Sequence, residues 1–262
     1  MYDLVLPLDP HRAETYLTRL GAIAGALLAN RDDKRWFLED PFRGRVMAAW
    51  GGYADDHDDN WNTDVVTSGL FVYAMAAFAR RVVDHPDLYP QLHDQASALI
   101  TATIETYQAF RPELHLVDGD PFAYFVLPLS YGNLTCSNGV HGCYNYRAGA
   151  GKPLPYNCSL SMMKALAELA LASNSNLYRG SGEATPDRLM LATEEAPLVV
   201  AKNLAYFAAN LRPKTLSDLT CQHRRESTSE DRSKNASVRD ASRPPRGGLL
   251  VSLIQASVVS AR

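Results

Sequence analysis

The stretch KPLPYNCSLSMMKALAELALA, residues 152–172, decides the fold, because a proline-braced loop turns there into a helix. Pro153 and Pro155 favour an extended approach to that helix. Asn157 or Ser159 can then cap the exposed N–H groups that open it. Apolar residues follow at helical spacing and predict one buried stripe: Leu160, Met163, Leu166, Ala167 and Ala170.

This predicted helix is thin, because much of it is alanine: Ala165, Ala167, Ala170 and Ala172. A thin apolar helix is typical of a position with close neighbours on more than one side, as an inner helix of a bundle or toroid has. Asn174 and Ser175 are expected to end it.

The first helix of the chain is predicted from Asp9 to Asn30. Asp9 is an N-cap residue, and Pro10 suits the first helical turn. The expected apolar face consists of Tyr16, Leu17, Leu20, Ile23, Ala24 and Leu27.

Three further helices are predicted, and with the helix of residues 152–172 they form two hairpins. Thr63 or Asp64 caps one that runs to Arg81, and the next runs from about residue 91 to 110, so the two make an antiparallel hairpin. The last runs from about residue 186 to 211 with a kink or break at Pro197, and forms a second hairpin with the helix of residues 152–172.

The connections between these helices are long. Residues 31–52 are expected to form a structured loop in which 45–50 is a short strand. Residues 111–156 hold many prolines, glycines and aromatics, and connections of this length usually carry function. Within them, residues 122–129 predict a short buried strand or a helical turn.

Composition excludes several classes of protein. The hydrophobic fraction of 46% is that of a globular chain, and the net charge of −3 gives no electrostatic reason to expect nucleic acid or an anionic membrane as partner. No apolar run reaches the roughly 20 residues of a membrane helix, and the start of the chain does not resemble a signal peptide. We therefore expect a cytoplasmic location.

The four cysteines, Cys136, Cys143, Cys158 and Cys221, are scattered along the chain. In a reducing compartment they are expected to be free thiols, with a bridge between Cys136 and Cys143 as the alternative. Their spacing predicts no zinc site.

The character of the chain changes after Arg212. Residues 222–248 are charged and serine-rich with almost no apolar residues, which predicts disorder. The expected division is a helical-hairpin domain over 1–212 and an irregular tail over 213–262.

Three segments carry a resemblance to known proteins: WNTDVVTSGLFVYAMAAFARRVVDHPDLY at 61–89, LPYNCSLSMMKALAELA at 154–170 and EEAPLVVAKNLAYFAANLR at 194–212. In this pattern a polar loop leads into a thin inner helix. An outer helix follows, and the chain then enters the next inner helix. This arrangement resembles the (α/α) toroids of polysaccharide lyases, uronyl epimerase-like proteins and six-hairpin glycosidases, over roughly residues 9–212.

The resemblance implies an all-α fold of antiparallel helical hairpins that form a partial (α/α) toroid. A complete toroid needs more hairpins than the chain provides before residue 212, so we expect a truncated one. The implied activity is that of a polysaccharide lyase or glycosidase acting on a saccharide in the toroid cavity. The implied substrate-binding groups lie at the starts of the inner helices: Trp61, Asn62, Tyr156 and Asn157.

Several of these side chains also have a purely structural interpretation. Asp64 and Asn157 suit helix caps, and Trp61 and Tyr156 suit packing. Trp50 and Tyr53 are equally open to both interpretations.

The acidic segment 54–60 contains Asp55, Asp56, His57, Asp58 and Asp59. Such a density of oxygen ligands could hold Ca²⁺ or Mg²⁺, but the spacing of an EF-hand is missing, and a solvated loop is favoured. The DDxxD string also occurs in terpene synthases, but here it follows glycines rather than lying on a helix. No metal site and no cofactor are predicted.

Two kinds of chemistry remain open for the candidate catalytic residues. Lyase chemistry needs a base beside a carboxylate and a group that stabilises the enolate. The loop offers His115, Tyr131, His141, Tyr144 and Tyr146 as acids or bases, and Arg147 as the group that binds the substrate carboxylate. Hydrolysis needs two opposed carboxylates, for which Asp64 and one aspartate of 55–59 are the candidates.

The competing hypothesis is a non-catalytic, truncated helical-hairpin protein that binds a partner or a sugar. An incomplete toroid exposes an apolar edge, through which self-association is expected.

Overall fold

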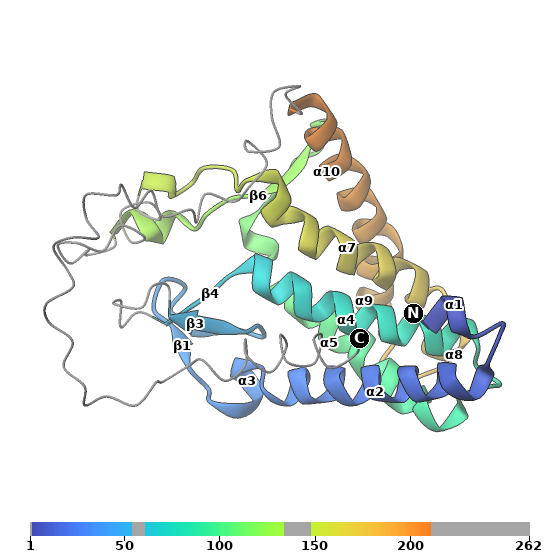
Figure 1. Ribbon diagram of the computed structural model, residues 1–262. Coiled ribbons are helices and arrows are strands. Elements are labelled where there is room, and N and C mark those ends of the chain that lie inside the picture. The colour runs from blue at the N-terminus through green and yellow to red at the C-terminus, as the bar shows by residue number, and fades with distance from the viewer. Residues whose placement is uncertain (1, 54–60, 134–147, 211–262) are drawn as a thin grey trace, which may run out of the picture. The chain divides into compact units, whose positions relative to one another are not determined.

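The computed structural model describes residues 2–53, 61–133 and 148–210 (Figure 1). The chain divides into two units, 1–221 and 222–262, and all described residues belong to the first. Of the described residues, 67% are helical and 9% are in strands, which confirms the prediction of a mainly α chain. The expected domain boundary after Arg212 lies outside the described residues.

The long helices are α2 (Pro10–Ala29), α4 (Val65–Asp84), α5 (His93–Phe110), α7 (Tyr156–Ser173) and α10 (Ala196–Asn210). Short helical elements connect them: α1 (Tyr2–Val5), α3 (Asp32–Arg35), η1 (Pro90–Leu92), η2 (Arg111–Glu113), η3 (Leu129–Asn133), α8 (Asn176–Arg179), α9 (Pro186–Met190) and the π-helical turn η4 (Leu191–Glu195).

The strands form three separate antiparallel pairs. They are β1 (Glu39–Asp40) with β2 (Arg45–Val46), β3 (Gly51–Tyr53) with β4 (Trp61–Thr63), and β5 (Leu114–Leu116) with β6 (Ala123–Phe125). The first two pairs lie in the connection between α2 and α4, and the third follows α5 (Figure 1).

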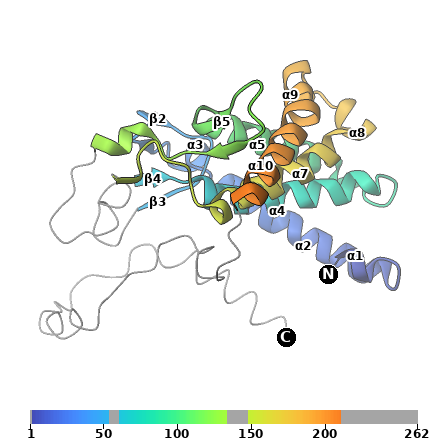
Figure 2. The same ribbon diagram turned by 90° about the horizontal axis from the view of Figure 1, so that it is seen from above.

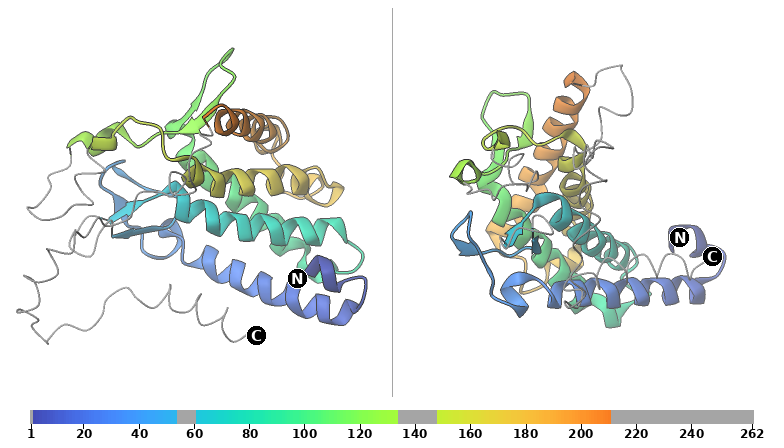
Figure 3. Two further views of the ribbon diagram at one scale, coloured as in Figure 1. Left: turned by 45° about the horizontal axis from the view of Figure 1, so that its top comes forward. Right: turned by 60° about the vertical axis from the view of Figure 1, so that its left-hand side comes forward.

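Helices α4 and α7 form the centre of the core. They lie side by side and run in the same direction, while α2 and α5 pack on α4, and α10 packs on α7 (Figures 1 and 3). A Cβ atom at Gly69 of α4 would lie 2.5 Å from the backbone nitrogen of Met162 in α7, so glycine permits the close approach of the two backbones. The predicted pairs of helices, and the thin helix with neighbours on several sides, are confirmed.

The starts of α2 and α4 follow the predicted caps. The Asp9 carboxylate accepts a hydrogen bond from the Arg12 N–H at 3.0 Å, and the Asp64 carboxylate accepts one from the Thr67 N–H at 2.7 Å. Each aspartate satisfies one of the N–H groups that a helix start leaves without a partner.

The predicted cap of α7 was wrong. Pro155 is the N-cap residue and makes no side-chain capping bond, while Asn157 and Ser159 lie inside the helix. The φ angle of Pro155, −51°, already suits a turn into the helix, so α7 begins directly after the proline.

The predicted apolar face of α2 was partly wrong. Ile23 is 53% exposed, and the buried positions are Ala13, Leu17, Gly21 and Ala24. A Cβ atom at Gly21 would lie 2.7 Å from the Phe78 ring of α4, so glycine permits the close approach of α2 to α4 at this position.

The short elements also differ from expectation in part. The predicted strand at 45–50 is limited to β2, because residues 47–50 turn away before β3 begins. The strand alternative for 122–129 is confirmed by β6. The expected break at Pro197 was wrong, because α10 runs through this residue. The irregular turn lies just before it, in the π-helical η4.

The interpretation of Cys158 as a free thiol was wrong, because its sulfur is in a disulfide. Cys136, Cys143 and Cys221 lie outside the described residues. Helix α4 is long and apolar enough to cross a membrane, but more than half of its apolar window is buried within the protein, as in the core helix of a folded domain.

Candidate functional site

Two buried aspartates, Asp32 in α3 and Asp40 in β1, lie among the strand pairs that precede α4. Both are almost completely removed from solvent, yet their surroundings differ. Because a buried carboxylate is costly unless it is hydrogen-bonded, the number of donors around each one separates a structural role from a chemical one.

Asp40 is a structural carboxylate. Its oxygens accept hydrogen bonds from the Phe42 N–H at 2.9 Å and from both the N–H and the hydroxyl of Thr63, at 2.9 and 2.8 Å. The Arg43 guanidinium adds an ion pair. Asp40 therefore fixes the turn after β1 and joins it to the end of β4.

Arg43 extends this connection to the end of α5. Its guanidinium contacts both oxygens of the Glu113 carboxylate and also donates to the Thr63 carbonyl oxygen at 3.0 Å. Burial raises the pKa of Glu113 despite this ion pair. Arg43 thus holds β1, β4 and η2 together beside the start of α4.

Asp32 has far fewer donors. The Gly51 N–H and the Trp61 indole N–H both donate to its Oδ2 atom, at 3.0 and 2.9 Å. No hydrogen bond from the described residues reaches its Oδ1 atom. The residue is 2% exposed, and burial raises the pKa of its carboxyl to about 6, against the lowering effect of the two hydrogen bonds.

These properties make Asp32 the best candidate for proton transfer. A carboxyl whose pKa lies near neutral pH can both donate and accept a proton there, whereas an ordinary aspartate cannot. The Oδ1 atom, which accepts no hydrogen bond within the described ranges, is where such a proton would reside.

The contact between Trp61 and Asp32 depends on Gly51. A Cβ atom at Gly51 would lie 2.2 Å from the Trp61 Nε1 atom, so any side chain there would displace the indole. Gly51 pairs with Thr63 across β3 and β4, and Trp61 pairs with Tyr53. The indole therefore reaches back over the glycine to the carboxylate.

Arg31 positions the α3 turn that carries Asp32. Its fully buried guanidinium pairs with Asp33 and with Glu105 of α5, and donates to the Ala102 carbonyl oxygen at 3.1 Å. The two acidic partners raise the pKa of Arg31. The charge of Arg31 is thus fully compensated, and the start of α3 is fixed to α5.

Among the predicted site residues, Asp64 and Trp50 have structural contacts. Asp64 caps α4, as described above. Trp50 is 4% exposed, donates from Nε1 to the Leu27 carbonyl oxygen at 2.8 Å, and meets the edge of Phe71. Both correspond to the capping and packing interpretations that the sequence left open.

Trp61 and Asn62 lie together on β4, where Trp61 is half-buried and Asn62 is buried. The role of Trp61 in binding a substrate stays a prediction. The structure adds its contact with Asp32, which the sequence did not indicate.

The other predicted residues are not placed in the site. His141, Tyr144, Tyr146, Arg147 and the acidic segment 54–60 lie outside the described residues. Tyr156 and Asn157 form the first turn of α7, but their side chains are not described.

His115 and Tyr131 have partners of their own. The His115 Nε2 atom lies 2.8 Å from the Asp120 carboxylate, and its ring stacks on Tyr124. Tyr131 is buried beside Arg43, and burial raises the pKa of its hydroxyl. Neither residue is brought to Asp32 by a described contact.

Sequence reasoning missed Asp32, Asp40 and Arg43, because all three lie in a segment interpreted only as a loop. Asp40 had a detectable signal, since Asp40 and Pro41 with Gly44 form the pattern of a tight turn. Asp32 had none, because its partners Gly51 and Trp61 are far along the chain.

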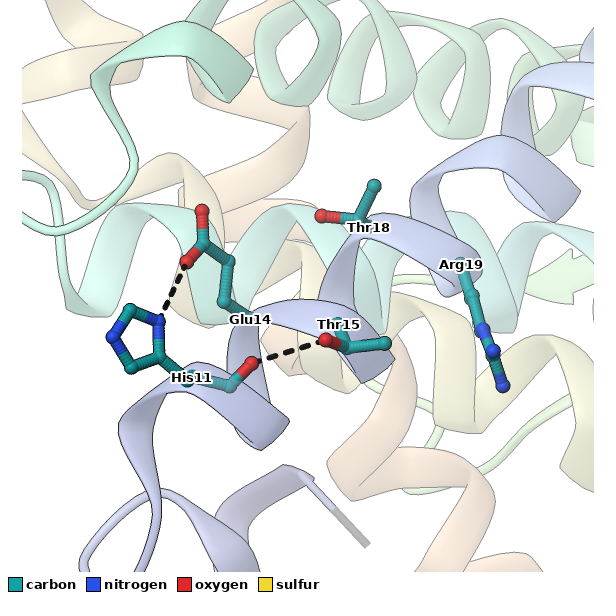
Figure 4. A pocket seen from close by; sticks show the side chains of 5 residues that line it. All are labelled: His11, Glu14, Thr15, Thr18 and Arg19. Atoms are coloured by element: carbon teal, nitrogen blue, oxygen red, sulfur yellow. Dashed lines mark hydrogen bonds and ion pairs between the residues drawn. The ribbon is translucent and has the colours of Figure 1, made fainter.

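Two further features do not form a site. A surface hollow on α2 is lined by His11, Glu14, Thr15, Thr18 and Arg19, and all five belong to one exposed helix (Figure 4). Within the described ranges, no group of three or more histidine, cysteine or acidic side chains could hold a metal ion.

No known family, no curated protein and no solved structure matches this chain.

Proposed function

We propose that this chain is a carbohydrate-active protein of the (α/α) toroid type, a polysaccharide lyase or glycosidase that acts on a saccharide. The arrangement of α4 and α7 supports the proposal. Inner helices of such a toroid lie next to one another and run in the same direction, and each is followed by a helix that returns outside it, as α5 follows α4 and α10 follows α7.

The observation that carries the proposal is the Asp32 carboxyl, which is buried, has one oxygen without a hydrogen bond from the described residues and has a pKa raised to about 6. In hydrolysis this carboxyl donates a proton to the departing glycosidic oxygen. In a lyase reaction it removes the proton beside the uronate carboxylate. Both reactions use a group that gains or loses a proton near neutral pH, and the Asp32 carboxyl is such a group.

Trp61 and four residues predicted from the sequence, which lie outside the described residues, are proposed to act with Asp32. Trp61 keeps Asp32 in position through its indole N–H. His141, Tyr144 and Tyr146 are proposed as the partner acids or bases, and Arg147 as the group that binds an acidic sugar.

The test is a panel of neutral and acidic polysaccharides incubated with the purified chain, with Asp32→Asn and Asp118→Asn as paired variants. Asp118 is an exposed aspartate in the turn between β5 and β6, so it controls for loss of one negative charge. We expect new reducing ends or unsaturated products from the wild type and the control, and at least a 100-fold loss in Asp32→Asn. Equal activity of both variants would exclude Asp32, and inactivity of all three proteins on the whole panel would reject the enzyme proposal.

A second candidate is a non-catalytic helical-hairpin protein that binds a partner or a sugar. It is favoured by large apolar side chains left exposed on the long helices: Leu70, Tyr73, Leu171, Leu198 and Leu204. Sugar binding without any product, measured by calorimetry on the same panel, would support this candidate over the enzyme.

The expected cytoplasmic location stays a prediction, and one finding weighs against it. Cys158 is in a disulfide, and disulfides persist mainly in oxidising compartments.

A further inference from the structure

Helices α4 and α7 begin side by side. A Cβ atom at Gly69 would lie 2.5 Å from the backbone nitrogen of Met162, and each of these residues lies in the second turn of its helix. Because the two helices run in the same direction, their N-terminal ends lie close to the same level (Figure 1). In the view from above, α10 lies in front of α7 (Figure 2), so α7 has a long helix on more than one side.

The two N-terminal ends differ in negative charge. Parallel neighbouring helices place the positive ends of their dipoles together, and negative groups at those ends stabilise them. Asp64 provides such a group at the start of α4. The N-cap residue of α7 is Pro155, which makes no side-chain capping bond. The described residues therefore leave the start of α7 without a negative cap.

A buried hydroxyl lies in the same part of α7. Ser159, the fourth residue of the helix, is 1% exposed, and its Oγ atom has no hydrogen-bond partner within the described residues. Side chains of a helix lean toward its N-terminus, so this hydroxyl points to the uncapped first turn. Because a buried polar group without a partner is costly, Ser159 indicates a ligand that supplies the missing acceptor.

We propose that the start of α7 binds a small anionic group: a carboxylate, a sulfate or a phosphate. The Ser159 hydroxyl and the backbone N–H groups of Tyr156 and Asn157 donate hydrogen bonds to its oxygens. Tyr156 and Asn157 are the first two residues of the helix, and N–H groups at these positions have no acceptor inside it. The helix dipole and these N–H groups together favour an anion.

The burial of Ser159 limits the ligand. A group that reaches a hydroxyl removed from solvent is itself enclosed, so the ligand is either a small ion or the anionic end of a larger molecule. The inference is independent of the proposed reaction, because it uses neither Asp32 nor any residue that contacts it.

Thermal unfolding of the full chain tests the proposal. The midpoint is measured with increasing phosphate, sulfate, acetate or glucuronate, with sodium chloride holding the ionic strength constant. A ligand that binds only the folded protein raises the midpoint in proportion to its occupancy and affinity. We expect such binding by the wild type with at least one of the four anions, and none with the neutral sugar glucose.

Ser159→Ala and Ser161→Ala form a matched pair of variants. Both remove a buried hydroxyl from α7, but the Ser161 hydroxyl already donates to the Cys158 carbonyl oxygen at 3.3 Å. We expect anion binding to be at least about 10-fold weaker in Ser159→Ala and unchanged in Ser161→Ala, because hydrogen bonds to charged groups are the stronger ones. Without an anion, Ser159→Ala should be at least as stable as the wild type, since no protein partner is lost.

The choice of anions separates the sources of the ligand. Binding of acetate and glucuronate alone identifies a carboxylate, and binding of phosphate and sulfate alone identifies an inorganic ion or a phosphorylated or sulfated molecule. A wild type that binds none of the four would overturn the proposal, and so would equal affinity of Ser159→Ala and wild type. A polysaccharide panel that gives no products would reject the enzyme proposal and leave the anion result unaffected.

Discussion

Replacing Asp32 with asparagine should make the protein more stable at neutral pH. The side chain keeps its shape, and its remaining oxygen can still accept from the Gly51 N–H and the Trp61 indole. What disappears is a carboxyl whose burial makes ionisation costly. Replacing a residue that serves chemistry at the expense of stability commonly makes the protein more stable.

The size of the effect follows from the pKa. The folded protein holds the Asp32 pKa at about 6, against 3.8 for an unperturbed carboxyl. Because the folded pKa is raised, the contribution of Asp32 to stability is fully present below pH 3.8 and is lost as the pH rises through 6. With 1.36 kcal/mol per pH unit, the full loss is about 3 kcal/mol above pH 7 and about 1 kcal/mol at pH 4.5.

The assay is urea unfolding followed by tryptophan fluorescence at pH 4.5 and at pH 7.5. The amide group adds a constant offset, so the informative quantity is the change in the free-energy difference between variant and wild type. The unfolding free energy of Asp32→Asn relative to wild type should rise by about 2 kcal/mol when the pH is raised from 4.5 to 7.5. The exposed control Asp118→Asn should show no such movement.

An unchanged difference between Asp32→Asn and wild type at the two pH values would refute the reasoning. It would mean that Asp32 ionises in the folded state as easily as in the unfolded one. The proposed role in proton transfer would then lose its physical basis, whatever the activity assays give.

Three other changes have defined outcomes. Gly51→Ala should displace the Trp61 indole from Asp32 and cost about 1 to 3 kcal/mol in urea unfolding, whereas Gly52→Ala, with open space around it, should cost less than about 1 kcal/mol. Arg43→Met leaves Asp40 and Glu113 buried without their cation, and should lower the unfolding free energy by about 3 to 5 kcal/mol, far more than Arg45→Met at an exposed arginine. Reduction should lower the thermal midpoint, and iodoacetamide should label Cys158 of the urea-unfolded chain only after reduction, because this side chain is buried in the folded protein; labelling of the unreduced chain would contradict the disulfide.

The sequence by itself determined the long helices and how they pair. Asp9 and Asp64 mark two helix starts because capping is a local interaction, made within three residues of the aspartate. The alanine-rich stretch in residues 152–172 predicted a central helix because a thin apolar helix is stable only with neighbours around it. Even so, the start of α7 was misplaced, since a fixed proline φ outweighed the polar cap candidates.

The tertiary structure alone decided where the candidate site lies. The chemistry of Asp32 arises from Gly51, Trp61 and the burial that Arg31 and α5 enforce, and these groups are up to 74 residues apart. An aspartate in a charged loop looks ordinary in sequence, because burial and the number of donors around a carboxyl depend on contacts distant in the chain. The same holds for α10: its apolar sequence predicted a helix, but only the tertiary structure shows that Leu198 and Leu204 are about half exposed.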